Sequence, residues 1–229
     1  MYLIKGNEKN ILVDTGGSGE EWAEEYHHGL IREKDMEPVN AVKKLGVQPE
    51  DVDLIINTHL HWDHSFNNHL FPNAKIIVQK KELEFAINPI PSHYVYYESY
   101  QIGLTPNWIK SMVNFEVVDG DKEIYEGIKV LYTPGHTPGF QSVLVNTKEG
   151  NYLIASDMVG LIENWHENTT GGVPTPSGIH VNLIEYYDSI NKMKEYSNYI
   201  LPGHDSKVLE YESFPNKEFQ EKYFDKYLK

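Results

Sequence analysis

The sequence predicts an α/β (α+β) protein in which mixed β-sheets are covered by helices, organised as one domain over residues 1–229. Two observations predict this class. Along the whole chain, short apolar runs that end in turn residues alternate with amphipathic patterns of helical period. The chain also contains no repeat, low-complexity tract or linker that would divide it, and 229 residues are enough to enclose one sizeable core.

The first half of the chain contains three predicted buried strands and two predicted helices. The strands are short apolar runs at residues 10–17, 53–57 and 74–79. The first helix covers residues 38–45, with a proline near its start and a glycine just past its end. The second helix follows the third strand directly, at residues 80–87. Strands and helices therefore alternate, which is typical of a sheet covered by helices.

The second half contains four predicted strands and one long helix. The strands are residues 127–133, 141–146, 151–156 and 199–201, and a hairpin turn joins the second to the third. The helix covers residues 182–196, with Asn182 as its N-cap and a glutamate three residues further on. Its apolar face is expected to consist of Leu183, Tyr187, Ile190 and Met193.

Residues 88–105 have no regular period and contain four tyrosines flanked by prolines. We expect a long loop or a broken helix with a large amphipathic surface. Two interpretations stay open for Tyr94 and Tyr97 within it. Either these side chains pack against the core, or they belong to a lid over a substrate pocket.

The composition argues against several classes of function. With a formal net charge of −14 the chain repels polyanions, so we expect no nucleic-acid partner. Arg32 is the only arginine, which argues against a bidentate clamp on a phosphate or carboxylate substrate. No apolar run is long enough to span a membrane, and the N-terminus has no signal-peptide pattern. The absence of cysteine fits a reducing compartment, so we expect a cytoplasmic protein.

Three histidines and an aspartate stand together in the segment INTHLHWDHS, directly after the second predicted strand. His59, His61 and Asp63 alternate, so on an extended turn they point the same way, whereas His64 faces a neighbouring point. One loop can therefore supply two adjacent metal positions. Imidazole and carboxylate ligands without thiolate suit zinc, with iron or manganese as alternatives. A solvated loop that happens to be rich in histidine is the other interpretation, and four such residues at this spacing argue against it.

Three further candidate ligands each follow a predicted strand. His136 stands on the turn TPGHTPG, Asp157 follows the strand of IASDMVG, and His204 lies in LPGHD after the last strand. Loops that leave strands are where sites on sheet scaffolds collect. We therefore expect these three side chains to join the cluster at residues 59–64.

These motifs resemble the metallo-β-lactamase superfamily. Its H-x-H-x-D-H signature stands at residues 59–64, and its later ligands match His136, Asp157 and His204 in that order. Its first motif is similar to ILVDTG, which places Asp14 behind the metal ligands. The resemblance covers nearly the whole chain and implies an αββα sandwich with a two-metal site at one edge. Because the chain begins close to the ILVDTG strand, we expect shortened N-terminal strands.

The resemblance also implies the ligands and the reaction. It implies two zinc ions per chain and attack on the substrate by a metal-bridging hydroxide, so that no protein nucleophile is needed. The implied ligands are His59, His61 and His136 for the first metal, and Asp63, His64 and His204 for the second, with Asp157 bridging both. Asp63 and Asp157 are the implied catalytic residues, and Asp63 is also placed to take a proton on the side of the leaving group.

Among the branches of the superfamily, the N-acyl-homoserine lactonases are the most similar. Two segments resemble the sequences of that branch, namely NAVKKLGVQPEDVDLIINTHLHWDH and TPGHTPGFQSVLV. The expected activity is therefore opening of the ring of an N-acyl-homoserine lactone or a related lactone, with quorum quenching as the associated role. Two alternatives stay open: a glyoxalase II-like thioesterase or other ester hydrolase, and a metal-binding sensor without turnover.

Two departures from that branch concern the substrate pocket. Gly160 stands where the branch commonly has a tyrosine that assists the substrate carbonyl. Phe66 and Asn67 stand in place of the paired glycines after the signature. The residues expected to line a pocket are Phe66, Tyr94, Tyr97, Gly160 and His166. We expect a small-molecule substrate as the partner and a monomer or homodimer as the assembly.

Overall fold

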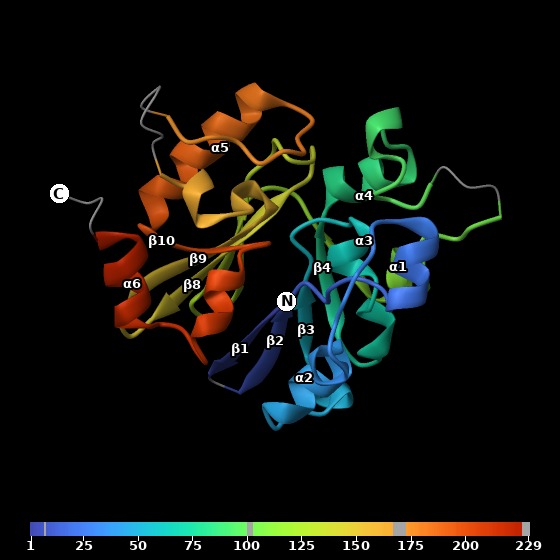
Figure 1. Ribbon diagram of the computed structural model, residues 1–229, viewed down its shortest axis with the longest axis horizontal. Coiled ribbons are helices and arrows are strands. Elements are labelled where there is room, and N and C mark those ends of the chain that lie inside the picture. The colour runs from blue at the N-terminus through green and yellow to red at the C-terminus, as the bar shows by residue number, and fades with distance from the viewer. Residues whose placement is uncertain (7, 100–102, 167–172, 226–229) are drawn as a thin grey trace. The chain divides into compact units, whose positions relative to one another are not determined.

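The computed structural model describes residues 1–6, 8–99, 103–166 and 173–225 (Figure 1). The chain forms two compact units, Met1–Val118 and Asp119–Lys229. Within the described residues, each unit is built on one five-stranded sheet with helices around it. This arrangement confirms the predicted α/β class.

The sheet of the first unit is mostly parallel. Its strands stand in the order β1-β2-β3-β4-β5, and β1 alone runs antiparallel to its neighbour. Their bounds are β1 Tyr2–Gly6, β2 Lys9–Val13, β3 Leu54–Ile56, β4 Lys75–Gln79 and β5 Phe115–Val118. Because β2, β3 and β4 are parallel, their carboxyl ends lie at one edge of the sheet, where sites of such sheets usually form. Asp14 directly follows β2, and the histidine cluster begins just past β3.

Helices connect these strands and bury their apolar side chains. The α-helices are α1 Glu20–Tyr26, α2 Pro38–Lys44, α3 Trp62–Ser65 and α4 Lys80–Ile87. The 3₁₀ helices are η1 Lys34–Met36, η2 Pro49–Asp51, η3 Asn68–Leu70, η4 Pro91–His93 and η5 Asn107–Asn114. One core cluster combines Val42 of α2 with Ile55 of β3 and Ile76 of β4. A second cluster consists of Leu60, Val78, Ala86, Tyr97 and Trp108.

The sheet of the second unit is mostly antiparallel, in the order β10-β9-β8-β7-β6. Its strands are β6 Lys122–Tyr125, β7 Ile128–Tyr132, β8 Gln141–Thr147, β9 Gly150–Ser156 and β10 Tyr199–Pro202. Strand β8 pairs antiparallel with both β7 and β9, and β10 pairs parallel with β9. Strands β7, β9 and β10 therefore run in one direction, and their carboxyl ends share one edge.

The long helix of the second unit is α5, Leu183–Tyr196. Its start is capped as predicted, since the Asn182 side chain accepts hydrogen bonds from the backbone of Ile184 and Glu185. The other helices are η6 Asp157–Val159, η7 Ile162–Asn164, η8 Ser206–Glu210 and α6 Lys217–Tyr223. Figure 1 shows α5 alongside the strands of this unit's own sheet.

Two sequence predictions about these elements were wrong in detail. The strand predicted to reach residue 17 ends at Val13, because Asp14 has φ of +59° and leaves the extended conformation. The buried face of α5 consists of Tyr186, Ser189, Ile190 and Met193. Leu183 is exposed instead, because Tyr186 takes the inner position and its hydroxyl donates to the carbonyl of Met158. Strands β1, β5 and β6 and helices α1, α3 and α6 were not predicted.

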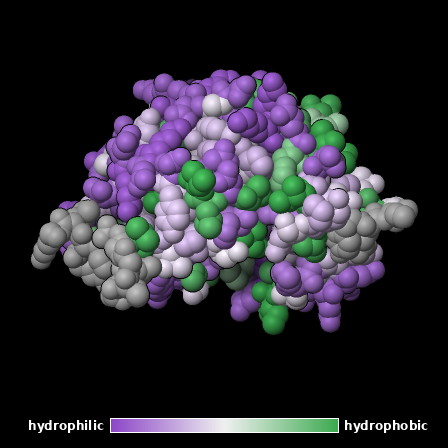
Figure 2. Space-filling model, turned by 90° about the horizontal axis from the view of Figure 1, so that it is seen from above, coloured by the Kyte–Doolittle hydropathy of each residue, from purple (hydrophilic) through white to green (hydrophobic). Residues whose placement is uncertain are grey.

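Among the described residues, no helix combines the length and apolar character that a membrane span requires. The face drawn in Figure 2 is largely hydrophilic, with hydrophobic residues scattered over it in small groups.

Candidate metal centre

The first unit carries the histidine cluster at the carboxyl edge of its sheet. His59 and His61 lie in the loop after β3, and His61 is the N-cap of the short helix α3. Asp63 and His64 lie in the first turn of that helix. The predicted extended alternation therefore ends at His61, because the chain turns into a helix at Trp62. As a result, the loop supplies one pair of side chains and the helix supplies the other.

The three imidazole rings of this cluster are buried and close together. The ring centroid of His59 lies 4.4 Å from that of His61 and 4.2 Å from that of His64. His59 is fully buried, whereas the side chain of Asp63 is 28% exposed. The carboxylate of Asp63 lies 3.5 Å from Nε2 of His64. Polar rings are seldom buried at this density without a partner that binds them together.

Asp14 orients two of these histidines through hydrogen bonds. Its Oδ2 lies 2.8 Å from both His64 Nδ1 and the Thr58 hydroxyl, and its Oδ1 accepts from the Thr58 backbone N–H at 2.8 Å. Because a carboxylate only accepts, both Nδ1 of His64 and the Thr58 hydroxyl donate to it. The Thr58 oxygen in turn lies 3.1 Å from His59 Nδ1. Nε2 is therefore the nitrogen that His59 and His64 present to a metal.

His61 is oriented by a different neighbour. Its Nε2 lies 3.3 Å from Nδ1 of His93, which is buried at the end of η4. This contact engages Nε2 of His61 on the side of the ring that faces η4. The rings of Tyr96 and Tyr97 also lie against His61, at centroid distances of 5.0 and 4.8 Å.

The second unit carries the other three predicted ligands. His136 follows β7, Asp157 follows β9, and His204 follows β10, so all three stand at the shared carboxyl edge. The Asp157 carboxylate lies 3.6 Å from His136 Nε2 and 3.1 Å from His204 Nε2. Nδ1 of His136 donates to the carbonyl of Ile179 at 2.7 Å, which directs Nε2 towards Asp157. One carboxylate between two imidazoles is an arrangement that suits a bridging ligand.

A close backbone approach holds Asp157 beside His204. A Cβ atom added at Gly203 would collide with the Asp157 carboxylate and would lie 2.9 Å from the carbonyl carbon of Ser156. Ser156 itself has φ of +46°, an unusual value for a residue other than glycine. The backbone N–H of Gly203 donates to the carbonyls of Ser156 and Val159. Position 203 in the LPGHD motif therefore has no room for a Cβ atom and requires glycine.

Asp205 stabilises the same loop through hydrogen bonds. Its carboxylate accepts hydrogen bonds from the backbone of Ile162 and Lys207, at 2.9 and 3.0 Å. Burial by itself would raise the pKa of Asp205, but these hydrogen bonds and the Lys207 side chain outweigh it and hold the pKa below its usual value.

The residues predicted to line a pocket fall in several different places. In the first unit, Tyr97 is fully buried and donates to Glu82, Tyr94 is 36% exposed, and the Phe66 ring packs edge-on against Trp22. In the second unit, the backbone N–H of Gly160 donates to the Ser177 hydroxyl at 3.2 Å. His166 donates through Nε2 to the carbonyl of Tyr223 at 2.7 Å. Residues 100–102 of the predicted lid lie outside the described residues.

The sequence did not single out two buried carboxylates of the first unit. Glu82 of α4 accepts from the backbone of Leu60, which lies between His59 and His61. Glu98 accepts from His27, and the His27 ring stacks on Trp62 at a centroid distance of 4.0 Å. The only available signals were the positions of these residues beside predicted elements, and such positions do not identify a partner that lies 22 or 71 residues away in the chain.

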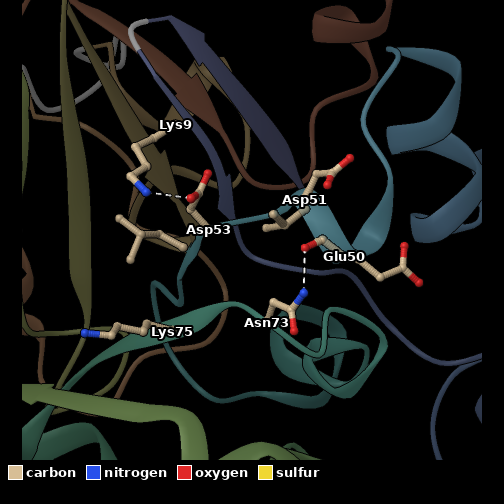
Figure 3. A pocket seen from close by; sticks show the side chains of 8 residues that line it. Lys9, Glu50, Asp51, Asp53, Asn73 and Lys75 are labelled. Atoms are coloured by element: carbon tan, nitrogen blue, oxygen red, sulfur yellow. Dashed lines mark hydrogen bonds and ion pairs between the residues drawn. The ribbon is translucent and has the colours of Figure 1, made fainter.

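A separate cavity of about 540 Å³ lies at the opposite edge of the first sheet (Figure 3). It is lined by the amino ends of β2, β3 and β4 and by nearby charged residues, among them Lys9, Asp53 and Lys75. Lys9 Nζ lies 2.6 Å from Asp53, and Asn73 donates to the carbonyl of Glu50 at 2.9 Å. None of the predicted site residues lines this cavity.

The set of side chains fits zinc in its donor chemistry. Imidazole nitrogen and carboxylate oxygen are ligands that zinc accepts, and Nε2 of His64, His136 and His204 lies 3.5, 3.6 and 3.1 Å from an aspartate carboxylate. The described histidines and aspartates include two groups of suitable composition. One group has three histidines, and the other has two histidines and two aspartates. This composition is sufficient for two zinc ions.

The fold and these motifs define the class of the protein. The family model of the metallo-beta-lactamase superfamily matches residues 1–204. The chain therefore belongs to this superfamily. Within it, the chain is 35% identical to an N-acyl homoserine lactonase of Bacillus thuringiensis over 176 residues. That match covers 72% of this chain and 66% of the relative, just under two thirds of the relative's length.

Two further comparisons extend over more of the chain. An N-acyl homoserine lactonase of Rhizobium radiobacter, AttM, is 28% identical over 226 residues and matches 90% of this chain and 81% of its own. A solved N-acyl homoserine lactone hydrolase has N-hexanoyl-L-homoserine, its product, bound at the catalytic metal center. That structure matches with a TM-score of 0.70 at 28% identity and covers 93% of this chain and 84% of its own.

Proposed function

We propose that this protein is a dinuclear zinc hydrolase that opens the ring of N-acyl-homoserine lactones. The observation that carries the proposal is a ligand set arranged on the edges of two sheets, in which hydrogen bonds to groups outside the set orient His59, His64 and His136. The long similarity to named N-acyl homoserine lactonases supports the choice of substrate. The role that accompanies such an activity is quorum quenching.

The proposed ligands form two sets. His59, His61 and His136 would hold one zinc ion, and Asp63, His64 and His204 would hold the other, with Asp157 shared. The composition of the two groups supports this division. The position of Asp157 between His136 and His204 supports its role as the bridge.

When bound, such a pair of metal ions lowers the pKa of a shared water and polarises a carbonyl oxygen. The chain's own residues orient this chemistry. Asp14 and Thr58 keep the proton of His59 and His64 on Nδ1, so that Nε2 can act as a ligand. Asp63 is partly exposed, so its carboxylate can also receive a proton from the side of the leaving oxygen.

The charge of the protein supports a neutral substrate ring. The net charge of −14 disfavours an anionic substrate, and a lactone ring is uncharged. Arg32 is already engaged, because its guanidinium donates to the carbonyls of Gly17 and Ser18 and pairs with Glu37 at 2.7 Å. A substrate anchored by its own negative charge would therefore lack an arginine partner.

A substrate panel tests the proposal. The zinc-loaded protein is assayed with N-acyl-homoserine lactones of several chain lengths, beside γ- and δ-lactones, a simple ester and a glutathione thioester. We expect turnover of the homoserine lactones that disappears with a chelator, returns with zinc and is absent from Asp157→Ala. Metal-dependent turnover of the thioester with every lactone inert would instead favour the glyoxalase II-like activity. No turnover with any substrate by protein that holds two zinc ions would favour a sensor.

We also propose that the two compact units work together as one domain over residues 1–229. The match of one superfamily to residues 1–204, which include parts of both units, supports this. A small-molecule substrate without a nucleic-acid partner, a cytoplasmic location and a monomeric or homodimeric state stay predictions. Analytical ultracentrifugation of the zinc-loaded protein tests the last of them.

A further inference from the structure

Glu82 is a charged residue in the interior of the first unit. It lies in the first turn of α4, which begins directly after β4, and none of its surface is exposed. The surrounding core cluster consists of Leu60, Val78, Ala86, Tyr97 and Trp108. A buried carboxylate is unfavourable in such surroundings unless hydrogen bonds stabilise it.

Two hydrogen bonds to Glu82 come from groups beside a proposed metal ligand. Oε1 accepts from the backbone N–H of Leu60 at 2.9 Å and from the Tyr97 hydroxyl at 2.6 Å. Leu60 is the residue between His59 and His61. The Tyr97 ring, held by its hydroxyl, lies edge-on to the His61 ring at a centroid distance of 4.8 Å. One carboxylate oxygen of Glu82 therefore accepts a hydrogen bond from the backbone of the loop. The same oxygen also holds the Tyr97 ring that packs against His61.

The backbone of the loop between β3 and α3 must be held in place if His59 and His61 are to keep their positions. Its side chains alternate, so Leu60 points into the core while His59 and His61 point to the metal edge. A small rotation of the Leu60 peptide would move both histidines, because they flank it directly. The Glu82 hydrogen bond opposes that rotation, and the buried Leu60 side chain opposes displacement along the loop.

We propose that Glu82 is a positioning residue that holds His59 and His61 in the geometry required by the first zinc ion. This inference rests on the proposed function, because it assumes that the two histidines bind a metal. A purely structural carboxylate would be needed for the stability of the core but not for metal affinity. Groups behind metal ligands commonly change affinity about 10- to 100-fold when they are replaced.

Four variants separate these roles. Glu82→Ala removes the acceptor for both hydrogen bonds, whereas Glu82→Gln keeps one neutral acceptor oxygen in nearly the same shape. Tyr97→Phe removes one donor and leaves the hydrogen bond to Leu60. Val78→Ala is the matched control, because Val78 belongs to the same core cluster but makes no hydrogen bond to the loop through its side chain.

The measurements are zinc dissociation constants from chelator competition, the visible spectrum of the cobalt(II)-substituted protein, and thermal unfolding of the metal-free protein. We expect zinc affinity to fall about 10- to 100-fold in Glu82→Ala and by less in Glu82→Gln and Tyr97→Phe. The cobalt bands should shift in both Glu82 variants, because the ligand geometry changes. Val78→Ala should lose thermal stability while keeping the parent's zinc affinity and spectrum.

Two results would overturn the inference, and they are distinguishable. If Glu82→Gln and Glu82→Ala lose stability but bind zinc and cobalt as the parent does, Glu82 is a structural residue and the proposed function stands. If the parent itself binds no zinc, the proposed function fails and the inference fails with it. Should Glu82→Ala not fold, a parent-like spectrum and affinity in both Glu82→Gln and Tyr97→Phe would be sufficient to reject the positioning role.

Discussion

Replacing Asp14 by asparagine should change the proton position on His64. The backbone N–H of Thr58 can only donate, so the asparagine must place its oxygen where Oδ1 stands now. Its NH₂ group then takes the place of Oδ2, which lies 2.8 Å from His64 Nδ1. To accept a hydrogen bond from that NH₂, His64 must move its proton from Nδ1 to Nε2. In the proposed ligand set, Nε2 is the nitrogen through which His64 would bind the second zinc ion.

The expected magnitude follows from the bonds that change. Asp14→Asn replaces a charge-assisted hydrogen bond to His64, worth about 1.5–3 kcal/mol, with a mismatched contact. The affinity for the second zinc ion should fall about 10- to 100-fold, which corresponds to about 1.4–2.7 kcal/mol. The matched variant is Thr58→Val, which keeps the Asp14–His64 contact and removes the hydroxyl beside His59 Nδ1. That variant should weaken mainly the first zinc ion.

Stepwise zinc titration against a chromophoric chelator resolves the two affinities. Circular dichroism of each metal-free variant shows whether the fold is retained. The reasoning would be refuted if folded Asp14→Asn bound both zinc ions with the parent's affinities. It would also be refuted if Asp14→Asn and Thr58→Val weakened the same zinc ion to the same extent.

Three further predictions concern the loops around the site. Gly17→Ala should lower the free energy of unfolding by about 1–3 kcal/mol in urea, because the added Cβ would lie 2.8 Å from the Trp62 ring and 3.3 Å from the Asp63 backbone. Gly19→Ala, where nothing lies within 4 Å, is its control, and equal stability of the two variants would contradict the steric argument. Glu98→Gln should be less stable than the parent at pH 7 by about 1–3 kcal/mol. Burial would raise the pKa of Glu98, but hydrogen bonds from His27, Asn107 and Trp22 hold it below its usual value. The carboxylate therefore stabilises the folded state above the unfolded pKa of about 4.3, and this contribution disappears as the pH falls through the folded pKa. The difference between parent and Glu98→Gln should narrow in acid unfolding curves, and a constant difference down to pH 3 would show that the charge is irrelevant. Asp157→Ala should lose both zinc ions, and Asp63→Ala mainly the second, as measured by elemental analysis. Parent-like zinc content in both variants would reject the ligand assignment.

The sequence by itself determined the class of the protein and the candidate ligands. The ligands stand in short motifs directly after apolar runs, and such runs predict strands from local periodicity alone. The strands before His59, His136, Asp157 and His204 were all predicted and confirmed. Glycines and prolines around His136 and His204 indicated the turns, because few other residues adopt the backbone conformations that turns require.

Only the tertiary structure decided which groups orient those ligands. Asp14 meets His64 across 50 positions of the chain, His27 meets Glu98 across 71, and Glu82 meets Leu60 across 22. Local periodicity cannot predict such contacts, because they depend on which strands become neighbours and how their side chains pack. The same reason explains the buried face of α5, where Tyr186 rather than Leu183 turns inward to reach Met158. Residue types and spacing therefore predicted the metal chemistry, while the packing of distant elements determined its geometry.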